Sequence, residues 1–363
     1  MAKKKSIFRK IVKRIFIVLH IVIGLAILYP QFFKPAKYIW VNGFITLAMP
    51  YLVLSLLLLL IFWLIIKPIY ASLSIVVFVI AWPSVSVLLA VNPSNFSLKK
   101  NSNYLRIASW NIKEFNGNEH NMPGHQFRAE TIANSVMKWS ADIVCLQEYN
   151  SKLNDKGAAN HQLLFQNKYP YSFFSKDYTS STEAYYAGCI IFSKYPILKS
   201  ERIAYTNHES LIYVDIQKGD DTIRVYTTHL ASYRFKSYDY DTEQSVKANK
   251  NVFKKMRVAF MERAVQASLV KEHLAQSPYP SIITGDFNDV PGSYTYTTIK
   301  GTRQDAFLKK GVGIGATYSG LSPTLRIDYI LPDQKWDVRA WESIDENLSD
   351  HHLILSDLKL LKN

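Results

Sequence analysis

The chain has 363 residues, enough for one large domain or two smaller ones, and a formal net charge of +14 from 43 basic and 29 acidic residues. Residues 1–100 hold twelve basic and no acidic side chains, so the other 31 basic residues oppose all 29 acidic ones in 101–363. The excess charge therefore belongs to the N-terminal third and is not the footprint of a nucleic-acid-binding face. Cys145 and Cys189 lie inside apolar runs, which indicates buried free thiols and no disulfide framework.

Three apolar spans follow the basic N-terminus, near residues 15–33, 43–66 and 69–91. Each is about long enough to cross a bilayer as a helix, and apart from His20 none of them contains an acidic or basic residue. Lys67 and Pro68 alone separate the last two spans, which predicts a tight helical hairpin. A signal peptide is the alternative for the first span, but no small-residue cleavage site is evident. We therefore divide the chain into a membrane anchor, a polar linker and a soluble domain, at residues 1–91, 92–103 and 104–363.

The basic N-terminus favours a cytoplasmic start, by the positive-inside rule. Three crossings then place the soluble domain outside the cytoplasm, in a multi-pass protein of a bacterial-type inner (plasma) membrane. The first span is the shortest and could instead lie along the membrane. Two crossings would leave the domain in the cytoplasm, and the sequence does not decide between the two arrangements.

From Tyr104 onward, short apolar runs alternate with amphipathic segments, which indicates an α/β domain. We expect strands at 105–110, 142–148, 188–192, 211–216, 222–226, 325–331 and 354–360. Apolar residues at three- and four-residue spacing predict helices over about 127–138 and 253–274, each burying one face. The turn at Lys218, Gly219 and Asp220 predicts a hairpin.

The stretch 281–289 contains the pattern on which the site is built. An apolar strand stops at Gly285, where the backbone can turn without a Cβ penalty, and then presents Asp286 and Asn288. Period-two geometry places these two side chains on one side of an extended segment. An anionic oxygen ligand beside an amide suits a phosphate with a divalent cation. The structural alternative is a strand end with an Asx-type turn.

Other polar residues recur at or beside the predicted strands: Asn111, Glu148, His229, Asp328, and Asp350 with His351. Any one of them could be structural, because a buried Asp often satisfies backbone donors. Together they are harder to explain in that way, since unpaired buried charge is costly. Their types also fit a single chemistry, because carboxylates can hold Mg²⁺, Asn and His can hold phosphate oxygens, and a His–Asp pair can activate water.

The order of these motifs resembles that of the endonuclease/exonuclease/phosphatase superfamily, which has the DNase I-like fold. The matching segments are Ser109-Trp110-Asn111, Leu146-Gln147-Glu148, Thr228-His229-Leu230, Gly285-Asp286-Phe287-Asn288, Arg326-Ile327-Asp328-Tyr329 and Ser349-Asp350-His351. They cover roughly 104–360, and the apolar spans lie outside the resemblance. The resemblance implies an α/β (α+β) four-layer sandwich, with two packed mixed β-sheets flanked by helices, behind the N-terminal transmembrane region.

The resemblance also implies a metal and phosphate site. Glu148 would be the principal ligand of Mg²⁺, for which Mn²⁺ could substitute, helped by Asn111 and Asp350. Asn288 and His229 would bind the scissile phosphate. Water would attack phosphorus in line, with the metal and His229 offsetting charge on the non-bridging oxygens.

The general base implied by the resemblance is His351, oriented by Asp328. His352 follows directly and leaves a second choice of base, although the family motif favours His351. Asp286 would position the attacking water or stabilise its deprotonation. No motif position is visibly replaced, which favours an active enzyme over a binding protein that only keeps the fold.

The motifs define the phosphate chemistry and not the leaving group. We expect hydrolysis of phosphodiester bonds, with a nuclease-type activity first and a phospholipid, sphingomyelin or inositol-phosphate esterase as the alternative. A non-catalytic, membrane-tethered binding protein is the third hypothesis. The partners are then nucleic acid or a phospholipid headgroup, and the bilayer; no protein partner can be inferred. Specificity should lie in loops 112–126, 151–185 and 231–251. The basic residues Lys254, Lys255 and Arg257 form either a solvated helix face or a lip that meets an anionic substrate.

Overall fold

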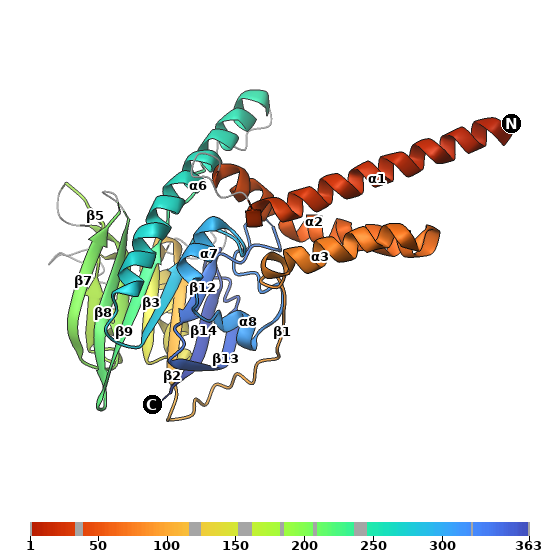
Figure 1. Ribbon diagram of the computed structural model, residues 1–363. Coiled ribbons are helices and arrows are strands. Elements are labelled where there is room, and N and C mark those ends of the chain that lie inside the picture. Colours follow the sequence, from red (N-terminus) through yellow and green to blue (C-terminus); the bar gives the residue numbers. More distant parts are fainter. Residues whose placement is uncertain are drawn as a thin grey trace.

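The computed structural model describes residues 2–32, 39–115, 125–151, 162–181, 185–205, 209–235, 245–320 and 322–361. It begins with three helices: α1 (Ala2–Phe32), α2 (Ile39–Ile66) and α3 (Ala71–Val85). Three helical stretches, Lys10–Pro30, Trp40–Ile66 and Pro68–Val85, are long and apolar enough to cross a membrane, the third including the 3-10 turn before α3. The three helices lie side by side and project away from the rest of the molecule, with the start of α1 at the far end (Figure 1). Proline at position 68 ends α2 because it cannot continue the backbone hydrogen bonds, and α3 returns antiparallel.

α2 is longer than a membrane crossing requires. Its 28 residues would extend about 42 Å, against roughly 30 Å for the hydrocarbon core of a bilayer. From Ile45 onward α2 packs in the apolar bundle with α1 and α3, and its first part also packs on helix α6 (Ser245–Ala275). There the ring of Phe44 stacks on Phe253 at 4.9 Å and meets Phe260 edge-on at 5.2 Å. The first part of α2 therefore belongs to the junction with the soluble domain.

Two sheets form the centre of the soluble domain. The five-stranded sheet has the order β12-β10-β9-β8-β7, with bounds Asp328–Pro332, Ser281–Asp286, Asp221–His229, Ser210–Lys218 and Ile197–Ala204. The larger sheet has the order β13-β14-β2-β3-β6-β4, with bounds Trp336–Ile344, Leu353–Leu360, Leu105–Asn111, Ile143–Ser151, Tyr186–Ser193 and Tyr171–Phe174, and β5 (Tyr178–Thr179) also pairs with β6. Both are mixed, because β9 and β10 run parallel, as do β2 and β3.

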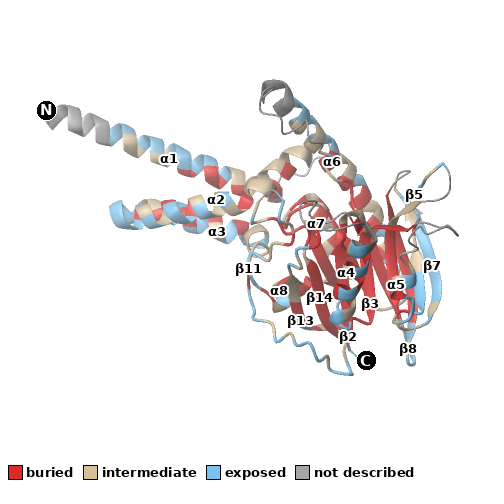
Figure 2. Ribbon diagram, turned by 180° about the vertical axis from the view of Figure 1, so that it is seen from behind, coloured by how far each residue is buried: buried red, intermediate tan, exposed pale blue. Residues whose placement is uncertain are grey.

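The two sheets pack face to face. Successive side chains along each strand point alternately into the core between the sheets and outward toward the covering helices. In β10, Ile282 points into the core between the sheets, whereas Ile283 points outward under helices α6 and α7 (Tyr294–Lys300). In β2, Ile107 points into that core and Ala108 outward under α4 (His125–Lys138) and α5 (Gln162–Gln166). Figure 2 shows the buried strands between these helices. The expected four-layer DNase I-like sandwich is confirmed.

The end of α3 leads directly into the soluble domain. The sequence placed the third apolar span as far as residue 91, but α3 ends at Val85, and Ala90 and Val91 form the short strand β1. β1 pairs with β11 (Val312–Gly313), which follows helix α8 (Ala306–Lys310), and Ala90 packs into the core between the sheets. Residues 90–91 therefore form a strand instead of continuing the helix, because they pair with β11 and Ala90 is buried in the core.

The predicted linker lies along the domain. The amide of Asn92 donates to Leu308 O at 2.8 Å, and the guanidinium of Arg106 donates to Ser97 O and Leu98 O at 2.6 and 3.1 Å. The backbone N–H of Trp341 donates to Ser94 Oγ at 3.1 Å. Most of the segment that follows α3 is thus fixed to the sandwich by hydrogen bonds.

Some strand positions differ from the sequence predictions. The strand expected at 325–331 begins only at Asp328, because Leu325 O accepts hydrogen bonds from Thr317 N and Tyr318 N outside the sheet. Strand β7 was not predicted: it lies at the edge of its sheet and is largely exposed and charged. The predicted hairpin turns at Gly219, whose φ of 63° suits glycine. Cys145 and Cys189 are buried free thiols, as predicted.

Candidate active site

The predicted residues of the five-stranded sheet meet at one edge of the sandwich. The parallel register of β9 and β10 sets His229 opposite Asp286, and the antiparallel register of β10 and β12 sets Asp286 opposite Asp328. Gly285 makes this close pairing possible: its φ is 141°, and a Cβ there would collide with Thr228 O. Strand register thus aligns three catalytic candidates that are far apart in the sequence.

The larger sheet contributes Asn111 and Glu148 to the same edge. The amide of Asn111 donates to Glu148 Oε1 at 2.9 Å within its own sheet and to Asp286 Oδ2 at 3.1 Å in the other sheet. Asp286 is only 1% exposed, and its other oxygen accepts the backbone N–H of Asn288 at 2.7 Å. The two sheets therefore converge on the Asp286 carboxylate.

Two of these residues have strained backbones. Glu148 has a φ of 48° and lies where the pairing of β3 with β6 shifts between Leu146 and Tyr149. Asn288 has a φ of 50°, and its amide donates to Leu230 O at 2.9 Å. Positive φ values at non-glycine residues cost free energy and persist where the surrounding structure fixes them. Here they turn the two side chains toward the site, and such bulges and outliers occur often beside active sites.

His351 is buried against Asp328. Its Nδ1 lies 3.0 Å from Asp328 Oδ2 and 3.2 Å from Oδ1, so this ring nitrogen donates to the carboxylate. Its Nε2 faces Asp286 Oδ2 at 3.6 Å. Burial alone would lower the pKa of His351, but the Asp328 and Asp286 carboxylates outweigh it and raise that pKa. The imidazole is thus strongly basic, and the nitrogen that does not contact Asp328 points into the site.

His352 has a different environment. Its two ring nitrogens lie 3.0 Å from Ser343 Oγ and 3.2 Å from Ser319 Oγ, and burial lowers its pKa. Its carboxylate neighbour is Asp345, with the oxygen 3.9 Å from Nε2, rather than Asp328 or Asp286. The geometry therefore favours His351 over His352 as the base, in agreement with the family motif.

The site also has the donors that a divalent cation requires. Glu148 and Asp286 converge on one amide, and His229 Nε2 lies 3.5 Å from Glu148 Oε1 and 3.7 Å from Asp286 Oδ2. That nitrogen is buried without a hydrogen-bond partner among the described residues. Asp286, Asp328 and His351 also place ligand atoms within 4.8 Å of one another. Because His351 and Asp328 hydrogen-bond to each other, the oxygen-rich side around Glu148 fits Mg²⁺ better.

Asp350 lies at the rim of the site. Its Oδ2 pairs with Lys113 Nζ at 3.2 Å, while Ser349 Oγ donates to Asn111 O at 2.8 Å and holds the turn beside β2. Asp350 is thus close to the other predicted ligands along the backbone, although its side chain has a lysine partner. Its predicted role as a metal ligand stays a prediction.

Sequence reasoning missed two groups of residues at the site. Thr317 is fully buried, and its hydroxyl accepts the backbone N–H groups of Ile327 and Asp328 at 3.0 and 3.1 Å. The next residue is Tyr318, and the centre of its ring lies 4.8 Å from the centre of the imidazole of His351. These residues join the Asp328 and His351 motifs, but Thr-Tyr in a loop has no pattern that would reveal it.

The second missed group is the turn after Asn111. Residues 113–115 all have positive φ values, and the turn presents Lys113 and Glu114 to the site. Burial, and then the charge of nearby Glu148, raise the pKa of Glu114. Two adjacent charged residues, beginning two positions after the predicted ligand Asn111, are the one sequence signal that could have indicated this turn.

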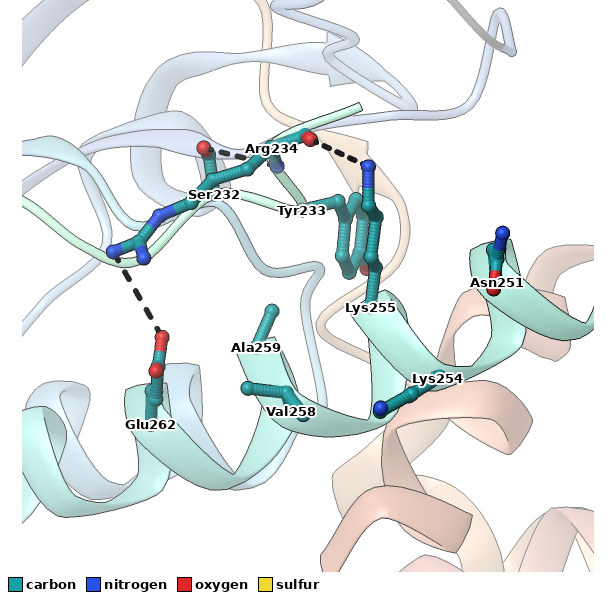
Figure 3. Close-up of a pocket in the computed structure, with 9 residues that line it drawn as sticks. All are labelled: Ser232, Tyr233, Arg234, Asn251, Lys254, Lys255, Val258, Ala259 and Glu262. Carbon is teal, nitrogen blue, oxygen red and sulfur yellow. Dashed lines mark hydrogen bonds and ion pairs between the residues drawn. The ribbon is translucent and has the colours of Figure 1, made fainter. Parts of the chain in front are cut away.

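A basic pocket opens a few residues beyond His229. It lies between the loop Ser232–Arg234 and the first half of α6, and Figure 3 shows its lining. Arg234, Lys254 and Lys255 supply positive charge, and Tyr233, Val258 and Ala259 supply apolar surface. Glu262 lies 4.0 Å from Arg234 and offsets part of that charge. Lys254 and Lys255 thus line this pocket, whereas Arg257 lies over the ring of Trp40 in α2. Whether the two lysines meet an anionic substrate or only solvent stays open.

Buried Arg263 fixes this region to the catalytic loops. It donates to Ala231 O at 2.9 Å, lies 3.4 Å from Asp289, and packs over the Phe260 ring that meets α2. Parts of the predicted specificity loops, 116–124, 152–161, 182–184 and 236–244, lie outside the described residues.

Comparisons with known proteins agree with this arrangement. A model of the endonuclease/exonuclease/phosphatase family matches residues 108–351, and a domain of unknown function (DUF8431) matches residues 9–88. No curated protein matched the sequence. The endonuclease/exonuclease/phosphatase from Beutenbergia cavernae is a similar solved structure, with a TM-score of 0.52 and 19% identity over 71% of this chain and 72% of that one.

Two further solved structures resemble the domain more weakly. The human Nocturnin catalytic domain has a TM-score of 0.49 and 17% identity, over 71% of this chain and 93% of that one. Sphingomyelinase C from Streptomyces griseocarneus has a TM-score of 0.45 and 17% identity, over 70% of this chain and 99% of that one. At such identities the solved structures show the fold alone.

Proposed function

This chain belongs to the endonuclease/exonuclease/phosphatase family, and from that premise we propose that it is a membrane-anchored, Mg²⁺-dependent phosphodiesterase. The observation that carries the proposal is the convergence of two sheets on Asp286. Asn111 joins Asp286 to Glu148, and the His351–Asp328 pair faces the same carboxylate. Acid, amide and imidazole groups of this kind can activate water and hold a phosphate.

The proton transfer is assigned to His351. Asp328 holds Nδ1 and so fixes the tautomer with Nε2 free to accept a proton from the attacking water. Asp286 lies 3.6 Å from that nitrogen and is placed to orient the water. Asp328 acts through His351 and is a positioning residue.

The phosphate is assigned to the other side of Asp286. Asn288 and His229 are the assigned phosphate ligands. Among the described residues the Nε2 of His229 has no hydrogen-bond partner, and the amide of Asn288 donates to Asp286 Oδ2 at 3.3 Å beside it. Glu148 would hold the cation with help from Asn111 and Asp350, and the cation would offset charge on the phosphate oxygens. The strained backbones of Glu148 and Asn288 support these roles, because they turn both side chains inward.

The three N-terminal helices are proposed to anchor the chain in a bacterial inner (plasma) membrane. α1 runs toward the sandwich, α2 runs away from it and α3 returns, which supports three crossings (Figure 1). With a cytoplasmic basic N-terminus, the catalytic domain is then extracytoplasmic. An impermeant thiol reagent should label a cysteine at Ser102 in intact cells, while the buried Cys145 and Cys189 stay unreacted. Labelling only after lysis would place the domain in the cytoplasm.

Two substrate classes have support. Catalytic loops lie against the anchor helices, which favours a phosphodiester in the headgroup of a bilayer lipid. Leu47 of α2 packs on Val290 and Ile327, close to Asp286 and Asp328, and Arg326 donates to Val87 O just after α3. The second candidate is a nucleic-acid strand, the activity expected first from the sequence. The basic pocket supports it (Figure 3). By helical spacing its lining residues Lys255 and Val258 lie on the face of α6 opposite Phe253, which stacks on α2, so the pocket faces away from the anchor.

The test is hydrolysis by the full chain in lipid nanodiscs with Mg²⁺, since α2, α3 and residues 86–98 all contact the domain. Disc phospholipids, plasmid DNA and bis-p-nitrophenyl phosphate would be assayed side by side, with Glu148→Gln as the inactive control. Cleavage of lipid and model ester supports the first candidate, and nicking of plasmid supports the second. No hydrolysis of any of the three would contradict the proposal.

A further inference from the structure

The short sheet after α3 exposes apolar side chains on one face. β1 and β11 pair antiparallel, with Val91 opposite Val312, and continuing the register sets Leu89 opposite Ile314. In an antiparallel pair, opposite residues and residues two apart share one face. These four side chains therefore form a single patch, with exposures of 55% for Leu89, 74% for Val91, 63% for Val312 and 39% for Ile314. Single exposed apolar residues are ordinary, but a contiguous patch marks an interaction site.

The patch is built on a fixed support. Ala90, whose side chain points the other way, is 3% exposed and belongs to the core between the sheets. The next residue, Asn92, donates its backbone N–H to Gly311 O at 2.9 Å and its amide to Leu308 O at 2.8 Å. The sheet is therefore held to α8 and the core, so that its apolar face stays presented to the outside.

The location of the patch identifies what covers it. Leu89 lies four residues beyond the end of α3, and Leu88 still packs on the apolar helix bundle. β1 and β11 lie on the side of the sandwich that faces the three helices (Figures 1 and 2). An apolar surface that continues from the end of a membrane-spanning helix meets the same bilayer.

The charges beside the patch fit this position. Helix α8 ends with Lys309 and Lys310, directly before β11. Lysines at the edge of an apolar surface suit the headgroup layer, where they attract anionic lipids while apolar side chains enter the acyl boundary. The described residues 86–98 and 306–314 contain no acidic side chain that would repel such lipids.

We propose that Leu89, Val91, Val312 and Ile314 form a second bilayer contact, which lays the catalytic domain on the membrane surface beside its anchor. This inference rests on the proposed membrane anchoring. Together with the junction at the first part of α2, it would hold the domain at two separate points and restrict its tilt. The Asp286 edge would then have a fixed orientation to the headgroup layer.

Fluorescent labels at single positions test whether the patch contacts the bilayer, and this measurement does not depend on enzymatic activity. Cysteines at Val312, at Leu198 in β7 and at Val79 in α3 would each carry a polarity-sensitive dye, in the full chain in nanodiscs with and without nitroxide lipids. The native cysteines are buried. Leu198 is the matched control, because it is exposed on the strand at the opposite side of the domain (Figure 1). Val79 reports insertion of α3 by itself.

The expected result is emission at shorter wavelength and quenching by nitroxide lipids at Val79 and Val312, and neither change at Leu198. Quenching at Val79 with Val312 as aqueous as Leu198 would overturn the second contact and leave the anchor intact. Equal quenching at Val312 and Leu198 would also overturn it. An unquenched probe at Val79 would overturn the anchoring proposal, and the inference with it.

A charge variant gives an independent measure. Val91→Glu with Val312→Glu should lower the ratio of lipid to model-ester hydrolysis roughly fivefold, because a charge near the bilayer boundary opposes contact. Leu198→Glu is the control. An unchanged ratio would contradict the proposal. If no substrate is hydrolysed, the proposed function fails, whereas the fluorescence still decides the contact.

Discussion

The edge of the sandwich around Asp286 and the side that faces the three N-terminal helices break a common rule in opposite ways. Charged residues are usually exposed in folded proteins and large apolar residues are usually buried. At the edge, Asp286 and His351 are charged groups buried among strand ends. On the helix-facing side, Val91 and Val312 are apolar groups left exposed. Buried charge requires partners, and exposed apolar surface requires cover. The partners at the edge lie within the chain, whereas we propose that the bilayer covers the second surface.

Removal of the metal should have the largest effect on the edge. Chelation of divalent cations, or Glu148→Gln, should reduce hydrolysis of a model ester to background, because the buried acids would face the phosphate without a compensating charge. Added Mg²⁺ should restore the chelated wild type and not the variant. Calorimetry should show weaker Mg²⁺ binding by Glu148→Gln. Full activity in EDTA would contradict a role for the metal in hydrolysis.

Replacement of the partner of His351 should have the next largest effect. Asp328→Asn keeps the shape but removes the charge, so the pKa of His351 in the metal-free protein should fall toward its usual value. Activity should fall by about 10- to 100-fold, a share of the general-base contribution. Histidine ring signals followed by NMR against pH measure the pKa, with His351→Ala identifying the signal.

The contact between His351 and Asp328 also predicts how the free energy of unfolding depends on pH. A raised pKa in the folded state means that protonated His351 stabilises the metal-free fold below the pKa of the unfolded chain. That stabilisation is lost as pH rises through the folded pKa. The loss should be smaller in Asp328→Asn. Identical stability profiles for the two proteins would show that the charge of Asp328 does not act on His351.

Loss of the Thr317 hydroxyl, in the loop beside the His351–Asp328 pair, should have the smallest effect. Thr317→Val leaves two backbone N–H groups without their acceptor, which should cost about 1–3 kcal/mol of stability. Activity should fall modestly, because the start of β12 shifts with Asp328. Thr317→Ser keeps the hydroxyl and is the matched control. Thermal unfolding distinguishes them, and equal stability of the two variants would contradict the positioning role.

The catalytic edge could be predicted in part from the sequence. The motif residues were found because each lies next to an apolar strand, and local alternation reveals strands. The family motif favoured His351 over His352, but the physical reason, the contact of His351 with Asp328, appears only in the structure. Thr317 was missed because its bonds reach backbone groups of a distant strand.

The exposed patch was hidden for a related reason. Val91 was counted with an apolar helix, because its own neighbours are apolar. Only its pairing with Val312, far along the chain, makes it part of a sheet with an outer face. Likewise, the charged edge strand β7 gave no alternating pattern, since its sheet leaves it largely exposed. Whether these segments form strands depends on pairing with residues far along the chain, and the local sequence gives no information about that pairing.

The most direct test of the central claim compares His351→Ala with His352→Ala, using the full chain in nanodiscs, saturating Mg²⁺ and bis-p-nitrophenyl phosphate. The histidines are neighbours, but only His351 faces Asp286. We predict that His351→Ala lowers kcat by about 10²- to 10⁴-fold, as expected for loss of a general base. His352→Ala should retain most of the activity. Equal losses in both variants, or a larger loss in His352→Ala, would contradict the assignment of the site.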